Sequence, residues 1–137
     1  ISEDIGHSML IVSSHDAFAV FVRKSLKGFL SVDVQKSAAS ARRMIMERYY
    51  DIIVVNAPLP DETGEDFVLD AAREGSASVL FVVPSEVYET ALERLTDFGI
   101  LVLSKPLQQG NLDKSIRFLV SIQLHVDLLW HERFRGL

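Results

Sequence analysis

The fold is indicated most clearly by residues 51–64, which read DIIVVNAPLPDETG. Residues 52–55 are all β-branched and show no polar alternation, a pattern typical of a strand covered on both faces. The two prolines and the glycine within residues 57–64 exclude a regular helix or strand, so a loop is predicted there. This segment therefore predicts a buried strand whose carboxyl end, at Asn56, opens into a loop.

Short apolar runs and helical patterns alternate on both sides of this segment, five of each in all. The alternation predicts an α/β fold with a parallel sheet and helices on both of its faces. In such folds the functional site lies at the carboxyl ends of the strands, near the point where the strand order reverses. The strands are expected at residues 9–12, 32–34, 52–55, 79–83 and 100–103, and the helices are expected to begin near Asp16, Ser37, Phe67, Val87 and Asn111.

The composition limits the class of protein. The chain has 137 residues, of which 48% are hydrophobic, and this fits one domain with a packed core. The lack of cysteine excludes disulfides, thiolate metal sites and a cysteine nucleophile, and the net charge of −5 argues against direct nucleic-acid binding. Because no apolar run approaches bilayer length and no basic-then-apolar leader is found, a cytoplasmic protein without membrane contact is expected. The chain starts at Ile1 rather than Met, and we interpret it as a piece of a longer protein.

Two segments and the order of the elements resemble the receiver domains of response regulators. The loop NAPLPDETG, residues 56–64, has its second proline and its glycine at the family spacing, and LSKPL, residues 103–107, is similar to the family's Lys-Pro segment. The order of the strand–helix units agrees from about Met9 to Gln123. The resemblance implies a flavodoxin-like (CheY-like), doubly wound sheet of five parallel strands in the order 2-1-3-4-5. It also implies a cis peptide bond within the Lys-Pro segment.

The acidic residues that the family uses are missing from this sequence. In receivers an aspartate at the end of the third strand accepts a phosphoryl group, two acids after the first strand help hold magnesium, a hydroxyl on the fourth strand binds the phosphoryl group, and a lysine pairs with its charge. The resemblance places Asn56, the pair Ser13 and Ser14, Val83 and Lys105 at these positions, and only the lysine matches. A neutral amide is a poor nucleophile and a positive pocket repels a dication, so we expect no phosphorylation, no magnesium or other cofactor, and no enzyme activity. We expect Lys105 to hydrogen-bond to Asn56 instead.

Other acids near the strand ends have structural interpretations. Asp16 lies where a helix could be capped. Asp61 and Glu62 are expected to cap and charge the start of the third helix. Asp51 precedes the third strand, at the opposite end from the pocket, so a structural role is expected.

The last helix is expected to extend farther than a sheet of this size requires. Its first part carries an apolar face for the sheet, and apolar residues then continue at spacings of three and four where no strand can cover them. Exposed apolar residues in such a pattern usually pack on a partner. We therefore expect a receiver-like domain over residues 1–123 and a helical extension over residues 124–137 that forms a homodimer; the alternative is a helix that folds back. The residues expected in the dimer are Val126, Leu129 and Trp130.

Within the receivers, residues 56–64 and 99–107 are most similar to the degenerate receivers of ANTAR-type transcription antiterminators. The resemblance implies a helical stalk that leads to an RNA-binding ANTAR domain beyond Leu137, so RNA is expected only as a partner of that segment. The main hypothesis is a pseudo-receiver of a two-component regulator that controls dimerisation without phosphorylation, with a partner signalling protein or a small ligand as its signal. One alternative is a stand-alone adaptor that binds proteins through the fourth helix, fifth strand and fifth helix. An enzyme on this fold is disfavoured, because neither a cofactor loop nor a catalytic pair is found.

Overall fold

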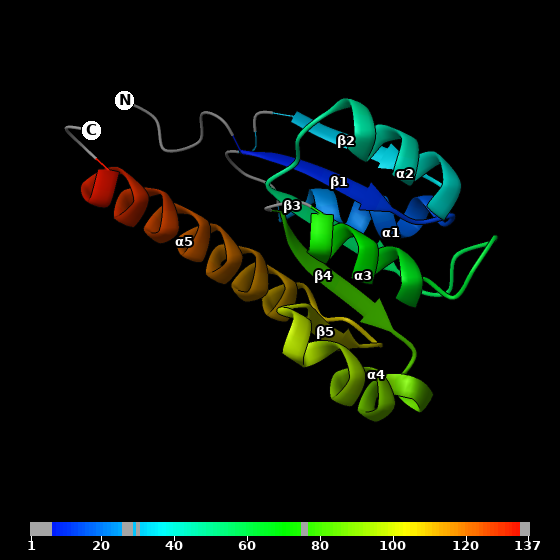
Figure 1. Ribbon diagram of the computed structural model, residues 1–137. Helices are drawn as coiled ribbons and strands as arrows, with labels where there is room; N and C mark the ends of the chain where they lie inside the picture. The colour runs from blue at the N-terminus through cyan, green and yellow to red at the C-terminus, as the bar shows by residue number, and fades with distance from the viewer. Residues whose placement is uncertain (1–6, 26–28, 30, 75–76, 135–137) are drawn as a thin grey trace.

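Five short strands form one parallel sheet in the order β2-β1-β3-β4-β5 (Figure 1). The computed structural model describes residues 7–25, 29, 31–74 and 77–134, with side chains described as far as Ile122. The strand order confirms the predicted flavodoxin-like arrangement. The elements are β1 (Ser8–Val12), α1 (Asp16–Arg23), β2 (Ser31–Gln35), α2 (Ala38–Glu47), β3 (Ile52–Asn56), α3 (Glu65–Glu74), β4 (Ser78–Val83), η1 (Ser85–Val87), α4 (Tyr88–Leu95), η2 (Thr96–Phe98), β5 (Leu101–Ser104) and α5 (Gln109–Phe134).

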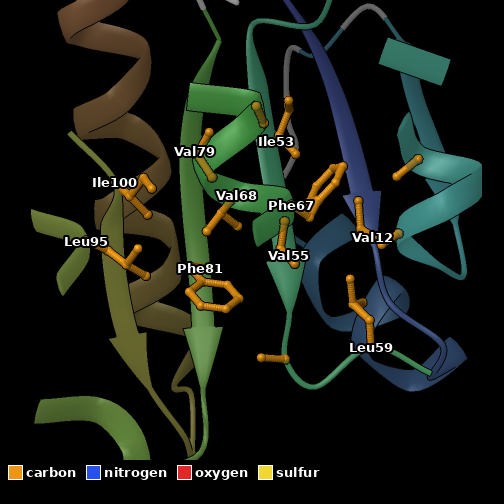
Figure 2. Packing of buried hydrophobic residues seen from close by; sticks show 14 of the residues in the cluster. Val12, Ile53, Val55, Leu59, Phe67, Val68, Val79, Phe81, Leu95 and Ile100 are labelled. Atoms are coloured by element: carbon orange, nitrogen blue, oxygen red, sulfur yellow. The ribbon is translucent and has the colours of Figure 1, made fainter. Parts of the chain in front are cut away.

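Helices cover both faces of the sheet and divide its side chains between two cores. Successive side chains of a strand point to opposite faces. Val55 and Phe81 therefore lie in the core beneath α2, α3 and α4 (Figure 2), whereas Val54 and Leu80 lie in the core beneath α1 and α5. Phe67 is fully buried in the first core, and truncation of such a phenylalanine to alanine costs about 3–5 kcal/mol. Burial on both faces explains why β3 reads as a continuous apolar run.

The loop after β3 is tied to two different helices by its acidic residues. Asp61 accepts hydrogen bonds from the backbone N–H groups of Ala38 and Ala39, each at 3.0 Å, and so caps α2. These two bonds lower the pKa of the Asp61 carboxyl. Glu62 accepts a hydrogen bond from the Phe67 N–H at 3.1 Å, in the first turn of α3. The expectation that both acids serve α3 is therefore wrong for Asp61, because its partner helix lies more than twenty residues back in the chain.

Gly64 ends this loop at a position that only glycine fits well. Its φ angle is +102°, in the region that side chains other than glycine rarely adopt. A Cβ atom at this position would also lie 3.0 Å from the Phe81 ring. The backbone therefore passes directly over a core residue of β4, which fixes where the loop lies above the sheet.

Asp51 joins three strands at the amino edge of the sheet. Its Oδ2 accepts a hydrogen bond from the Ser8 N–H at 2.8 Å, and its own N–H donates to the Ser8 carbonyl at 3.0 Å. Its carbonyl accepts from the Ser78 N–H at 2.9 Å. Asp51 thus serves the packing of the sheet, its side chain through β1 and its backbone through β1 and β4, as the sequence led us to expect.

The cap of α1 and the starts of α3 and α5 differ from the expected ones, and α3 begins at Glu65 rather than near Phe67. His15 is the N-cap of α1 and makes no side-chain capping bond, while Asp16 is already helical, so the interpretation of Asp16 as the cap is wrong. The Asp16 carboxylate instead lies 3.4 Å from the exposed Lys36 ammonium. Helix α5 begins at Gln109, two residues before the predicted start, and its 26 residues span about 39 Å at 1.5 Å per residue. Within the described part of the chain, no helix combines the length and apolarity needed to cross a bilayer.

Candidate functional site

Three of the residues expected in the pocket meet at the carboxyl edge of the sheet. Ser13 follows β1, Asn56 ends β3 and Lys105 follows β5. The strand order reverses between β1 and β3, and ligands of open α/β sheets bind in the crevice at such a point. The topology therefore places these side chains where a binding site is expected.

The Asn56 amide is buried and held in one orientation by Ser13. Asn56 is 4% exposed, and its Nδ2 donates to the Ser13 Oγ at 3.0 Å. The Ser13 hydroxyl is 3.3 Å from the His15 carbonyl, to which it donates, and it accepts from the His15 N–H at 3.1 Å. Because its single proton is used in this way, the hydroxyl can only accept from Asn56. The Asn56 Oδ1 is left without a hydrogen-bond donor among the described residues.

Lys105 does not make the hydrogen bond that the sequence suggested. Its Nζ donates to the Ala57 carbonyl at 2.7 Å, so the hypothesis of a bond to the Asn56 side chain is wrong. Partial burial of the ammonium lowers the pKa of Lys105. The peptide bond from Lys105 to Pro106 is cis, as expected, and that from Ala57 to Pro58 is also cis. The lysine therefore anchors the loop backbone after β3 and places a cation beside the buried amide.

The other two expected pocket residues lie apart from this group. Val83 is buried in the core beneath α2, α3 and α4, and Val82 takes the position beside Asn56. Strand register explains the difference, because Asn56 pairs with Val82 and side chains of paired residues point to the same face. Ser14 is half-buried and does not line the cavity described next.

A hollow of about 340 Å³ opens beside Asn56 and Lys105. Its walls come from the start of α1, the end of β4 and the segment that leads into α5, and most of the side chains on them are apolar. Gln109 at the start of α5 links these walls, since its Nε2 donates to the Phe21 carbonyl at 3.2 Å. The lining residues are His15, Ala17, Phe18, Phe21, Asn56, Val82, Lys105, Pro106 and Leu107.

Sequence reasoning missed the aromatic wall of the hollow. Phe18 and Phe21 recur at helical spacing, and both are half-buried against the core beneath α1 and α5. Their second role depends on α1 starting directly after β1, so that its first turn lies over the carboxyl edge of the sheet. Their positions about one and two turns after Ser13 and Ser14 were the signal available in the sequence.

The residues at this edge do not suit magnesium, the ion that receiver domains hold. Magnesium prefers hard oxygen ligands, and carboxylates above all. Here a serine hydroxyl engaged in three hydrogen bonds, a neutral amide and an ammonium group occupy the edge. No group of three or more potential histidine, cysteine or acidic metal ligands is found among the described residues. The side chains at this edge therefore do not form a magnesium site.

The residues expected in the dimer, Val126, Leu129 and Trp130, lie outside the part of the chain whose side chains are described. The backbone of α5 is helical through these positions as far as Phe134. Helix α5 continues past the sheet without interruption (Figure 1). Helix α5 therefore includes residues 124–134 of the expected extension.

Comparison with known proteins identifies the fold. The sequence matches no protein-family model and no curated protein. Solved structures do match. An adenylate cyclase from Rhodopirellula baltica is 17% identical with a TM-score of 0.81, covering 97% of this chain and 100% of that one. A CheY-like receiver domain from Methanospirillum hungatei is 18% identical with a TM-score of 0.77, covering 87% and 97%. The receiver domain of an HD domain-containing protein from Pseudomonas fluorescens is 19% identical with a TM-score of 0.75, covering 94% and 93%. The chain therefore has the CheY-like fold of response-regulator receiver domains.

Proposed function

We propose that this chain is a receiver-like signalling domain that works without phosphorylation. The proposal rests on Asn56. This residue takes the place of the family's phosphoacceptor, and its amide Nδ2 donates a hydrogen bond to the Ser13 Oγ at 3.0 Å. A carboxylate nucleophile is missing from this position, and Lys105, on the same pocket floor, is bonded to a backbone carbonyl. The domain receives its signal by binding a partner protein or a ligand, without catalysis and without a cofactor.

The experiment that tests this proposal is phosphorylation by a small donor. Incubation with acetyl phosphate and magnesium is expected to leave the intact mass of the chain unchanged, while a phosphorylatable receiver treated in parallel gains one phosphoryl group. The Asn56→Asp variant is expected to remain unmodified as well, because Ser13 and Ser14 still supply no acidic magnesium ligand. A stable phosphoryl adduct on the native chain would falsify the proposal.

We further propose that α5 joins two copies of the domain and leads to an output segment. Phe118 and Ile122, one turn apart, are 57% and 41% exposed. In the sequence, apolar residues continue at spacings of four and three to Val126 and Leu129, the spacings found in two-helix seams. By its resemblance to ANTAR-type antiterminators, the output would be an RNA-binding domain beyond Leu137, in a cytoplasmic regulator without membrane contact.

Sedimentation tests the dimer. Trp130→Glu and Phe118→Glu are expected to shift the chain toward monomer, because a carboxylate in an apolar seam loses its hydration. Val20→Glu is the matched control, since Val20 is equally exposed at 55% but lies on α1. An unchanged monomer–dimer balance in both α5 variants contradicts the stalk.

A second candidate function is that of an adaptor acting through α4, β5 and α5. A cavity of about 460 Å³ lies on this face, and it is lined mainly by the end of β5 and the first turns of α5. Val87, the last residue of η1, is 47% exposed and directly precedes Tyr88, which lines the cavity. A partner signalling protein would cover these residues. Sequence of the parent gene beyond the codon for Leu137 separates the two: a continued heptad stalk and a basic helical segment support the antiterminator, and a nearby stop codon supports the adaptor.

A further inference from the structure

The hollow at the carboxyl edge of the sheet combines an apolar wall with two polar groups on its floor. Phe18, Phe21 and Leu107 form much of the wall, and each is half-buried against the core. A volume of about 340 Å³ falls at the lower end of the range in which proteins bind small organic molecules. An apolar wall of this kind offers little to inorganic phosphate or to a hydrated cation. It suits a molecule with a hydrocarbon or aromatic body.

One of the two polar groups on the floor, the Asn56 amide, is closed to a ligand. Its Oδ1 is buried and has no donor among the described residues, while its Nδ2 is held by Ser13 at 3.0 Å. An oxygen that is closed off from solvent leaves no room for a ligand atom at hydrogen-bond distance. The amide therefore shapes the floor of the hollow, and recognition depends on the other polar group.

The same floor offers a positive charge at a second point. The Lys105 ammonium uses one of its three N–H groups on the Ala57 carbonyl. Among the described residues no carboxylate forms an ion pair with it, and none lines the hollow. An ammonium beside an apolar wall, with donors to spare, favours an anionic group on the ligand.

We propose that the hollow binds a small organic acid, with its carboxylate on Lys105 and an apolar body against Phe18 and Phe21. This inference deepens the proposed function, on which it rests for its meaning as a signal: a pocket without phosphoryl chemistry responds to a metabolite instead. The ligand would touch α1 and the segment leading into α5 together. Those two elements are already joined where Gln109 donates to the Phe21 carbonyl and to the Ser25 hydroxyl.

The binding test uses phenyllactate and hydroxyisocaproate, two acids that carry both recognition features. Binding to the full 137-residue chain is followed by two-dimensional NMR of backbone amides and of the Asn56 side-chain NH₂ group. A ligand of this size is expected to bind with Kd on the order of 1 mM. Lactate lacks the apolar body, so it is expected to bind at least about fivefold more weakly. Shifts are expected at Ser13, Asn56 and Lys105.

Two variants separate the site from nonspecific binding. Lys105→Met keeps the length of the side chain and removes its charge, and it is expected to weaken phenyllactate at least about tenfold. Lys114→Met removes an exposed charge from α5 outside the hollow and is expected to leave Kd unchanged. The proposal is overturned by any of three results: no shifts from either acid at about 10 mM, ten times the expected Kd, equal binding by Lys105→Met and the native chain, or inorganic phosphate binding as tightly as phenyllactate. The phosphorylation experiment is independent, since a phosphoryl adduct ends the proposed function whether or not phenyllactate binds.

Discussion

At the amino edge of the sheet Asp51 is a buried charge whose polar groups are matched, whereas at the carboxyl edge Asn56 is a neutral side chain with an unmatched oxygen. The Asp51 carboxylate and backbone bind Ser8 and Ser78 and so join three strands. The Asn56 amide binds Ser13 alone. The charged residue thus occupies the structural edge and the neutral one the edge where ligands of this fold bind. In this molecule the burial of an ionisable group is therefore a poor guide to the site.

The largest expected effect on the free energy of unfolding is at the amino edge of the sheet. Asp51→Ala removes a nearly buried carboxylate that accepts from the Ser8 N–H at 2.8 Å, and it leaves that donor unpaired. We expect the free energy of unfolding to fall by about 2 kcal/mol or more. Urea denaturation measures the change, with Asp97→Ala on the exposed η2 turn as the control. A loss no greater than that of the control would show that the three strands do not depend on Asp51.

The opposite result is expected at the carboxyl edge. Asn56→Leu replaces the amide with an apolar group of similar volume, and so removes the unpaired Oδ1 together with its bond to Ser13. The Ser13 hydroxyl keeps both of its contacts to His15. We expect the free energy of unfolding to stay within about 1 kcal/mol of the native value or to rise. The same urea experiment decides this, and a loss as large as that of Asp51→Ala would mean that the amide is structural.

The smallest expected effect concerns pH and the cap of α2. Hydrogen bonds from Ala38 and Ala39 lower the pKa of Asp61 in the folded chain, below the unfolded value of about 3.9. Stabilisation by the ionised carboxylate is therefore complete above the unfolded pKa and is lost as the pH falls through the folded pKa. Asp61→Asn is expected to lower Tm slightly at pH 6, and the difference from the native chain is expected to vanish in strong acid. Asp97→Asn provides the control, and a difference that persists at low pH would point to a contact independent of charge.

The sequence predicted the sheet well because its signals are local. Four β-branched residues at 52–55 and the loop at 57–64 depend on nothing outside those residues, and repetition of the pattern determined the order of the elements. The errors concern contacts between distant segments. Asp61 caps α2 rather than α3, and Lys105 bonds to the Ala57 carbonyl rather than to the Asn56 amide. Which of several nearby acceptors a long side chain reaches depends on loop geometry that spacing does not contain.

The hollow shows the same limit. Two residues that line the hollow, Asn56 and Lys105, were expected from the order of the strands, and so was Ser13, which is hydrogen-bonded to Asn56. The place of Val82 depends on strand register, and that of Phe18 and Phe21 on how closely α1 follows β1. These are properties of the packed sheet. A sequence gives the residues of such a wall, but only the assembled edge shows which of them face it.

The length of α5 has a mechanical consequence for the hollow at its base. The helix starts beside Phe21, to which Gln109 is hydrogen-bonded, and ends at Phe134. A straight helix of this length acts as a lever arm of about 39 Å, so a tilt of about 5° at its base displaces the far end by about 3 Å. Any event that rearranges the few side chains around Gln109 is thereby magnified into a shift comparable with the rise of two helical residues. A small local adjustment at the base of α5 thus changes the position of the far end of the helix relative to the domain.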